Sequence, residues 1–299
     1  MFILVTGASG QLGRSIKNLV EKSKVSHSFI FASRDQLDLS YLKGIRNYFK
    51  DHKFDLIINC AAYTKVDKAE NDEKQANLIN HLAVKQIAEI AQSNKIKLIH
   101  ISTDFVFDGL KRQPYFEEDT PLPLNVYGKT KLAGENAILS IMKTNASIIR
   151  TSWVYSEYGN NFVDTILRLI QKKVDLNIVS DQIGTPTYAN DLAQAILNII
   201  KNDKFTEFEK VSEVYHYSNE GECSWYDFAK EIANISGANC SINPISSENY
   251  PTAAKRPMYV LMSKRKVSEE FDVKINFWKD SLNNCMKNLP ILFSSNKNR

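Results

Sequence analysis

The first thirteen residues, Met1–Gly13 (MFILVTGASGQLG), decide the fold. An apolar run from Phe2 to Val5 enters a turn in which glycine recurs at every third position, and apolar residues at helical spacing follow. A short apolar run of this kind is typical of a strand buried on both faces of a parallel sheet. Strand, glycine turn and helix in this order predict a dinucleotide-binding unit, because the first N–H groups of the helix face a phosphate. A plain strand-turn-helix without a ligand is the alternative.

Each glycine of the turn has its own expected role. Gly7 allows the tight turn, Gly10 lets a pyrophosphate approach the backbone, and Gly13 lets the helix press against the strand. We expect Gln11 and Leu12, inside the same turn, to contact the cofactor as well. The spacing Gly-x-x-Gly-x-x-Gly resembles that of the extended short-chain dehydrogenases/reductases.

Length and composition indicate one large or two modest globular domains. The 299 residues are 43% hydrophobic and 24% charged, which are ordinary globular values. A net charge of +4 with both signs interspersed does not favour a nucleic-acid partner. The four cysteines show no Cys-x-x-Cys spacing, which favours a reducing compartment. No apolar run approaches membrane-spanning length, and the first strand leaves no room for a signal peptide, so we expect a cytoplasmic protein without a membrane partner.

Strand-like and helix-like segments alternate along the first half. Further apolar runs lie at Ser28–Ala32, Asp55–Cys60, Lys97–Ser102 and Ser147–Thr151, and Ala76–Gln92 is the clearest amphipathic helix between them. Strands separated by helices predict a doubly wound, mostly parallel α/β sheet of the Rossmann type.

The second half predicts a smaller, interleaved C-terminal substrate lobe. We assign residues 1–152 to the dinucleotide-binding domain and residues 153–299 to the substrate lobe, except that 174–218 returns to the sheet. We expect Ser294–Arg299 to be a disordered tail. The returning part is predicted to hold two strands and a helix between them: Leu176–Ser180, Glu213–Tyr217 and Asn190–Ile200.

The end of the second strand bears on the choice of cofactor. About twenty residues past the glycines, an acid would bind the ribose hydroxyls of NAD, whereas a small residue with an arginine would accept the extra phosphate of NADP. Ser33 and Arg34 favour NADPH, and Asp35 keeps NADH open. Asp38 and Leu39 are expected in the same cofactor site. The alternative for Arg34 is a solvated surface charge.

Two further strand ends supply candidate ligand contacts. Ala61, Ala62 and Tyr63 follow the third strand, where small residues leave space for a cofactor, although a simple tight turn fits equally well. Thr103 and Asp104 end the fourth strand. A hydroxyl there could cap a turn or donate to a substrate oxygen.

Tyr127 and Lys131 form the candidate catalytic pair. Their spacing places them one turn apart on the same face of a helix. A free phenol has a pKa of about 10, and lowering it by roughly three units needs about 4 kcal/mol, which an ammonium and a positively charged cofactor could supply together. Lys131 could also hydrogen-bond the nicotinamide ribose. The alternative is a surface pair without catalytic function.

Eight motifs spread over nearly the whole chain together resemble the dTDP-4-dehydrorhamnose reductase family. They are GASGQLG (7–13), NCAAYT (59–64), STDFVFDG (102–109), YGKTKLAGE (127–135), RTSWVY (150–155), DQIGTPT (181–187), SWYDFA (224–229) and RP (256–257).

The resemblance implies an NAD(P)H-dependent oxidoreductase that reduces the C4 ketone of dTDP-4-dehydro-β-L-rhamnose to give dTDP-L-rhamnose. Tyr127 would donate a proton to the developing alkoxide, Lys131 would lower the pKa of Tyr127 and hold the ribose, and Thr103 would hydrogen-bond the ketone oxygen. Three further side chains would face the sugar nucleotide: Asp104, Trp153 and Arg256.

The chain departs from the family pattern at two places. After Arg256-Pro257 the family commonly reads Asn-Ser-x-Leu-Asp, whereas this chain reads Met258–Met262 (MYVLM). Some relatives form a homodimer around magnesium held by glutamates, one of them just after the glycine turn, but here that stretch is Gly13-Arg14-Ser15. A homodimer stays open, and we expect no metal site because the histidines show no ligand spacing. His100, inside an apolar strand, is expected to be a packed core side chain.

Two other functions stay open. A relative of these reductases is a non-catalytic regulatory subunit of an adenosylmethionine-forming enzyme, and other relatives epimerise or dehydrate nucleotide sugars. The complete set of Thr103, Tyr127 and Lys131 favours catalysis over the first. Net consumption of NAD(P)H would distinguish a reductase from both.

Overall fold

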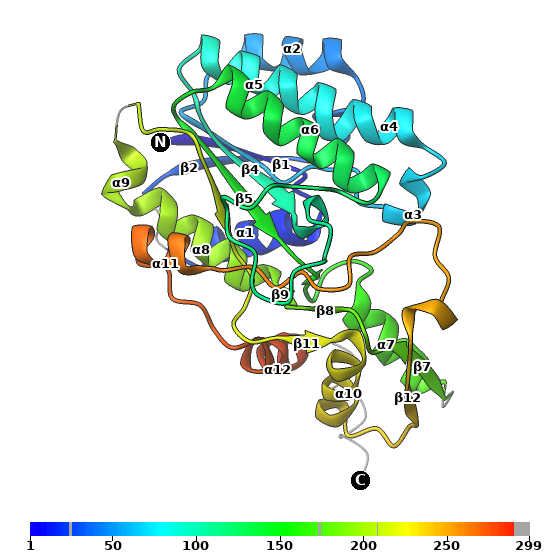
Figure 1. Cartoon of the computed structure of the whole chain (residues 1–299). Coiled ribbons are helices and arrows are strands. Elements are labelled where there is room, and N and C mark those ends of the chain that lie inside the picture. The colour runs from blue at the N-terminus through cyan, green and yellow to red at the C-terminus, as the bar shows by residue number, and fades with distance from the viewer. Residues whose placement is uncertain (24–25, 173–174, 208, 290–299) are drawn as a thin grey trace.

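The computed structural model describes residues 1–23, 26–172, 175–207 and 209–289, and its centre is a six-stranded sheet. The strand order is β10-β5-β4-β3-β1-β2, and every neighbouring pair is parallel (Figure 1). This confirms the predicted doubly wound sheet. The strands are β1 (Phe2–Thr6), β2 (Ser28–Ala32), β3 (Leu56–Asn59), β4 (Lys97–Thr103), β5 (Ala146–Thr151) and β10 (Glu213–His216).

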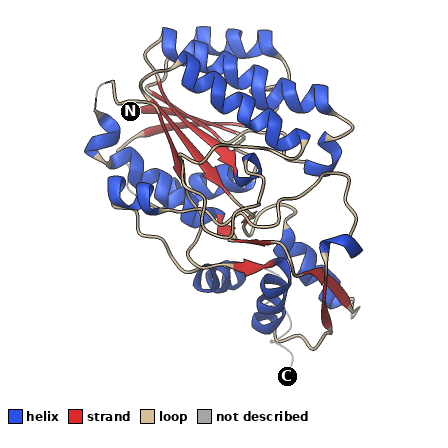
Figure 2. Cartoon of the chain, viewed as in Figure 1, coloured by secondary structure: helices blue, strands red, loops and turns tan. Residues whose placement is uncertain are grey.

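Helices cover both faces of the sheet, and alternate residues of the strands divide between two cores (Figure 2). Ile3 and Val5 pack with α1 and α8, whereas Leu4 packs on the opposite face with α2, α5 and α6. The helices are α1 (Gln11–Lys22) and α8 (Ala189–Lys201) on one face, and α2 (Leu42–Asp51), α5 (Ala83–Ser93) and α6 (Val126–Ile141) on the other.

The predicted helix Ala76–Gln92 is interrupted in the structure. It consists of α4 (Glu73–Asn77), a π-helical turn at Leu78–Leu82, and α5. A Cβ atom on Gly134 of α6 would lie 2.2 Å from the carbonyl oxygen of Asn80 in this turn. Periodicity alone does not reveal a π-helical turn, because it adds one residue without ending the apolar face.

The C-terminal lobe has its own core, centred on Phe228 and Trp278. Within the described residues, it contains three pairs of short strands and three α-helices, with the short helices α9 (Asp203–Thr206) and α11 (Arg265–Phe271) beside the main sheet (Figure 1). The pairs are β6 (Val154–Tyr155) with β9 (Thr187–Tyr188), β8 (Ile183–Gly184) with β11 (Cys223–Ser224), and β7 (Leu176–Val179) with β12 (Ile242–Ile245). The helices are α7 (Phe162–Gln171), α10 (Trp225–Ser236) and α12 (Trp278–Asn288).

The predicted return to the main sheet is half right. Glu213–Tyr217 provides β10 at the sheet edge and Asn190–Ile200 lies within α8, as expected. The prediction for Leu176–Ser180 is wrong, because this strand pairs with β12 and buries Leu176 in the lobe core. The boundary at residue 174 and the predicted tail Ser294–Arg299 lie outside the described residues.

The divergent stretch Met258–Met262 joins the two halves of the molecule by backbone hydrogen bonds. Ile183 N–H donates to Met258 O (2.8 Å), and Tyr115 N–H donates to Leu261 O (2.8 Å). Val260 and Met262 are buried. Two apolar residues at this departure from the family pattern therefore pack into the protein, whereas Met258 is 40% exposed.

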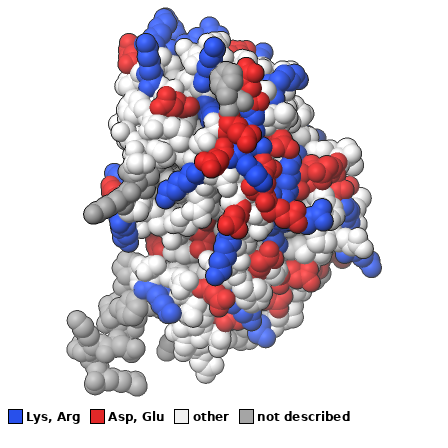
Figure 3. Space-filling view, turned by 90° about the vertical axis from the view of Figure 1, so that its left-hand side faces the viewer, with Lys and Arg blue, Asp and Glu red and all other residues white. Residues whose placement is uncertain are grey.

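The face shown in Figure 3 carries Lys and Arg side chains interspersed with Asp and Glu. Among the described residues, no helix combines the length and the apolar character needed to cross a membrane.

Candidate active site

The glycine turn between β1 and α1 forms a cradle lined by backbone atoms. Gly7 has φ +65°, and a Cβ atom on it would lie 2.8 Å from Ala61 N. A Cβ on Gly13 would lie 2.5 Å from Gly7 O, whereas Gly10, which precedes α1, has only Gly7 O nearby at 3.2 Å. The first N–H groups of α1 have no partner within the helix. The cradle therefore fits a pyrophosphate, with Gly10 at the point of closest approach.

Gln11 connects this turn to the C-terminal lobe. Its Oε1 accepts hydrogen bonds from Ser156 Oγ (2.9 Å) and Asn161 Nδ2 (3.0 Å), and its Nε2 donates to Val154 O (3.2 Å). Leu12 is buried in the core beneath the turn. The Gln11 side chain is used for hydrogen bonds within the protein and the Leu12 side chain for core packing. We therefore expect these two residues to contact the cofactor through their backbone N–H groups.

The residues predicted to select the cofactor lie just beyond β2. Ser33 donates through its N–H and its hydroxyl to Gln36 Oε1 (3.0 and 3.2 Å). The Arg34 side chain is 71% exposed, and its Nε lies 3.5 Å from Asp38 Oδ2, while Leu39 is buried. Ala8 N–H donates to Ala32 O (3.1 Å), so this strand end adjoins the glycine turn and Arg34 can turn toward a ligand there.

The loop after β3 is fixed by hydrogen bonds to Asn80, a residue that the sequence analysis did not single out. Asn80 Oδ1 accepts from Tyr63 N–H (2.8 Å), and Asn80 Nδ2 donates to Tyr63 O (3.1 Å). Ala61 N–H donates to Thr6 Oγ1 (3.3 Å), which places Ala61 and Ala62 beside the glycine turn. The π-helical turn carries Asn80 to this contact, and an asparagine at helical spacing from the apolar Ala76, Ala83 and Val84 was the available signal.

Thr103 and Asp104 stand at the carboxyl end of β4. Thr103 Oγ1 donates to Asp104 Oδ1 (3.0 Å) and accepts from Phe105 N–H (3.2 Å), so it also caps the following turn. Burial raises the pKa of Asp104 to about 7, against the lowering effect of its hydrogen bonds. Asp104 Oδ2 is buried and has no hydrogen-bond partner among the described residues, which suits a ligand hydroxyl.

Tyr127 lies in the first turn of α6 with only 9% of its surface exposed. Its ring packs edge-to-face on Phe105, with 5.6 Å between centroids. Burial raises the pKa of Tyr127 to about 12, the charge of Asp104 adds to this, and a hydrogen bond with Thr103 opposes it. The expectation that Lys131 lowers this pKa is therefore not met in the protein by itself, because burial of the phenol outweighs the opposing contacts. The phenol is fully protonated at neutral pH.

Lys131 lies on the same helix and is 1% exposed. Its Nζ donates to Ile101 O (2.6 Å) and lies 3.4 Å from His100 Nε2. Burial lowers the pKa of Lys131 to about 8, and the charges of Glu135 and Cys60 oppose that shift. Lys131 is thus fixed beneath the strand ends and is close to its titration point at neutral pH.

A buried ion pair one turn further along α6 fixes this helix to the sheet. Arg150 of β5 binds Glu135 through two nitrogens, with Nη2 to Oε2 at 2.7 Å and Nε to Oε1 at 3.1 Å. The side chains are 4% and 1% exposed, and Ser102 donates to the same carboxylate. The pair was not predicted, because a Glu and an Arg fifteen residues apart give no local pattern.

Two residues predicted to contact the substrate, Trp153 and Arg256, interact with other residues of this chain in the structure. Trp153 has φ +46° and stacks on Trp225 with 3.6 Å between ring centroids. Arg256 forms a two-point ion pair with Asp67 of α3 (Val66–Ala69), at 3.0 and 2.7 Å. Arg256 therefore links the C-terminal part of the chain to α3 of the sheet domain.

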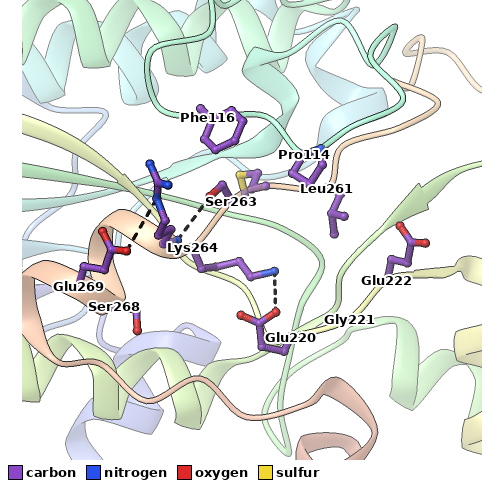
Figure 4. A pocket seen from close by; sticks show the side chains of 12 residues that line it. Pro114, Phe116, Glu220, Gly221, Glu222, Leu261, Ser263, Lys264, Ser268 and Glu269 are labelled. Carbon is purple, nitrogen blue, oxygen red and sulfur yellow. Dashed lines mark hydrogen bonds and ion pairs between the residues drawn. The ribbon is translucent and has the colours of Figure 1, made fainter.

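A pocket of about 650 Å³ lies elsewhere, between segments 114–116, 220–222 and 261–269 (Figure 4). Lys264 pairs with Glu220 at 3.3 Å and Arg265 with Glu269 at 3.9 Å. Because these opposite charges neutralise one another, the pocket does not select a diphosphate. Among the described residues, no group of three His, Cys, Asp or Glu side chains could hold a metal ion.

The site therefore brings the glycine turn, the loop after β3, the end of β4 and the start of α6 to one edge of the sheet. Known proteins resemble this chain over nearly its whole length. Residues 1–291 match the family described as "RmlD substrate binding domain". A dTDP-4-dehydrorhamnose reductase of Sinorhizobium fredii is 37% identical over 285 residues, which cover 94% of this chain and 95% of the relative.

Two solved structures agree with the whole fold. A dTDP-4-dehydrorhamnose reductase of Clostridium acetobutylicum has a TM-score of 0.88 at 37% identity, over 96% of this chain and 99% of the other. The Bacillus anthracis enzyme of the same name, in complex with NADP, has a TM-score of 0.89 at 33% identity, over 96% of this chain and 98% of the other. This chain belongs to the family of the dTDP-4-dehydrorhamnose reductases.

Proposed function

We propose that this protein is an NADPH-dependent reductase that converts dTDP-4-dehydro-β-L-rhamnose to dTDP-L-rhamnose. The observation that carries the proposal is the convergence of Tyr127, Thr103 and Lys131 beside the glycine turn, in a chain of the reductase family. The reductases it matches over nearly their whole length bear this activity in their names.

The chain offers a complete set of contacts for the dinucleotide. The backbone cradle at Gly7, Gly10 and Gly13 would hold the diphosphate, and Ser33 with Arg34 would hold the phosphate that distinguishes NADPH. Lys131 would hydrogen-bond the nicotinamide ribose. When bound, the cofactor supplies the hydride.

Two side chains of this chain, Tyr127 and Thr103, would supply the proton and the hydrogen bond that the C4 oxygen needs. Tyr127, which is fully protonated, would donate to the oxygen that develops negative charge at C4, and Thr103 would donate a second hydrogen bond to that oxygen after exchanging Asp104 Oδ1 for it. A proton donor held in place contributes about 10²- to 10⁴-fold to the rate. Burial of both groups strengthens these contacts, because water does not compete for them.

We assign the sugar nucleotide to the C-terminal lobe, which contains β6 to β9, β11, β12, α7, α10 and α12. Asp104 would accept a hydrogen bond from a sugar hydroxyl through its unpartnered Oδ2. Trp153 would contact the sugar nucleotide with the edge of its stacked ring, and Arg256 would bind the diphosphate after exchanging Asp67 for it. The four cysteines are free thiols, which agrees with a cytoplasmic location.

The test is to mix the purified protein with NADPH and the 4-dehydro sugar nucleotide and follow NADPH absorbance. A reductase consumes one NADPH for each ketone reduced, and product analysis shows the new C4 hydroxyl. Isomerisation without net loss of NADPH would assign an epimerase instead. Binding of NADPH without turnover of any 4-dehydro sugar nucleotide would assign a non-catalytic subunit.

A further inference from the structure

A row of buried polar side chains crosses three strands directly beneath the active site. Thr6 of β1 is paired in register with Asn59 of β3, and Asn59 is paired with His100 of β4. Side chains paired in register on parallel strands point to the same face of the sheet. Two residues earlier on each strand, that face is apolar and forms the core under α5 and α6: Leu4, Ile57 and Leu98.

The members of this polar row are joined by hydrogen bonds. Thr6 Oγ1 donates to Asn59 Oδ1 (2.6 Å), and Asn59 Nδ2 lies within hydrogen-bond distance of His100 Nδ1 (3.0 Å). The other ring nitrogen of His100, Nε2, faces Lys131 Nζ at 3.4 Å. All four side chains are at most 1% exposed, so water does not replace any of these contacts.

The row begins at the glycine turn. Thr6 directly precedes Gly7, and its hydroxyl also accepts from Ala61 N–H (3.3 Å). At its other end, Lys131 has Ile101 O as its second partner, at 2.6 Å. One continuous set of hydrogen bonds therefore connects the diphosphate cradle with the lysine that would meet the nicotinamide ribose.

We propose that His100 is a positioning residue for Lys131, which it ties through Asn59 and Thr6 to the glycine turn. The inference rests on the proposed function, because it gives Lys131 its part in holding the cofactor. His100 is buried, as expected of a core side chain, but its two ring nitrogens are used for polar contacts rather than for packing alone.

The physical reason lies in the surroundings of His100, which combine apolar neighbours with two polar partners. A buried polar group is costly unless it is hydrogen-bonded, so a position on the face that also holds Leu98 and Ile148 would ordinarily carry an apolar residue. An imidazole is long enough to reach Asn59 with one nitrogen and Lys131 with the other. Asn59 Nδ2 can only donate, so His100 Nδ1 accepts and Nε2 carries the ring proton, and this N–H donates to Lys131 Nζ when the lysine is the neutral amine.

A lysine side chain has four rotatable bonds, and a single contact leaves it several conformations. Two contacts, to Ile101 O and to His100, confine Nζ to one place. The cofactor then binds without first having to order this side chain. Removal of the imidazole should weaken cofactor binding through Lys131 and not through the fold in general.

The experiment measures the NADPH dissociation constant by fluorescence for a double-mutant cycle of His100→Leu and Lys131→Met. We expect His100→Leu to weaken binding about tenfold alone, but by less than about twofold when Lys131 is already methionine. Ile148→Val changes a buried residue in register with His100 and should leave the dissociation constant unchanged. His100→Gln, whose amide reaches as far as Nε2, should restore most of the affinity.

A further variant keeps the test valid where leucine prevents folding. His100→Asn preserves the contact with Asn59 but is too short to reach Lys131, so it should bind NADPH as weakly as His100→Leu. Wild-type affinity in both His100→Asn and any folded His100→Leu protein would overturn the inference. An equal loss in the Lys131→Met background would also overturn it, because the effect would then not pass through Lys131. Wild-type affinity and turnover in Lys131→Met itself would instead refute the role of Lys131 in the proposed function.

Discussion

Asp104 should make the protein less stable as the pH rises, and Asp104→Asn should remove this effect. Burial raises the pKa of Asp104 from 3.8 to about 7, so the folded chain binds this proton more tightly than the unfolded chain. The stabilisation from the proton is complete below the unfolded pKa and is lost as the pH rises through the folded value. The carboxylate that remains above that pH is buried, and its Oδ2 has no partner among the described residues.

The folded and unfolded pKa values of Asp104 set the size of the change in the free energy of unfolding. A shift of about three units corresponds to about 4 kcal/mol, of which about 3 kcal/mol falls between pH 5 and pH 8. The asparagine has no proton to lose, so the free energy of unfolding of Asp104→Asn, relative to wild type, should rise by about 3 kcal/mol between those two pH values. All other titrating groups are common to both proteins and cancel in the difference.

The assay is urea unfolding of both proteins at the two pH values, followed by circular dichroism. Asp51→Asn, at the exposed end of α2, is the matched control, and its stability difference from wild type should change by less than about 0.5 kcal/mol. The reasoning is refuted if Asp104→Asn and wild type keep the same stability difference at both pH values.

Three further predictions concern the lysine, the buried ion pair and the cofactor phosphate. Because burial lowers the pKa of Lys131 to about 8, kcat/KM for NADPH should fall about tenfold per pH unit above that value as the ammonium is lost; a steady-state pH series that stays flat to about pH 10 would contradict this. Glu135→Gln should lower the free energy of unfolding by about 3–5 kcal/mol in urea, since it leaves the Arg150 guanidinium buried without its counter-charge. Glu269→Gln removes an exposed ion pair with 3.9 Å between its charged atoms and should lower the free energy of unfolding by less than about 1 kcal/mol in the same assay. Equal losses in Glu135→Gln and Glu269→Gln would show that burial does not make the Glu135–Arg150 pair the stronger one. Arg34→Ala should weaken NADPH at least about fivefold in a binding titration and leave NADH nearly unchanged, whereas equal weakening would remove Arg34 from phosphate recognition.

The sheet, and the position of Thr103 near the glycine turn, were predictable because their signals are local. An apolar run such as Leu56–Ile58 is typical of a strand buried on both faces of a parallel sheet, and Gly7 and Gly13 each occupy a place where a Cβ would collide with backbone. Parallel strands also bring their carboxyl ends to one edge, so Thr103 had to lie near the glycine turn.

What the sequence did not reveal depends on tertiary contacts. Leu176–Val179 is four residues long and would suit either sheet, and its partner is decided by packing against the lobe core. The pairing of Glu135 with Arg150, and of Arg256 with Asp67, joins residues from different elements without any spacing rule. The raised pKa of Tyr127 in the protein by itself was not predictable for the same reason: burial depends on the whole surrounding structure, and it outweighs the opposing hydrogen bond with Thr103.

The most direct test of the central claim is the single-turnover rate of Tyr127→Phe with NADPH and the 4-dehydro sugar nucleotide. Tyr127 is the proposed proton donor, so the rate should fall by at least about 100-fold while the dissociation constant for NADPH changes by less than about threefold. A rate within about tenfold of wild type would show that the proton reaches C4 oxygen from another group, and the proposed mechanism would be wrong.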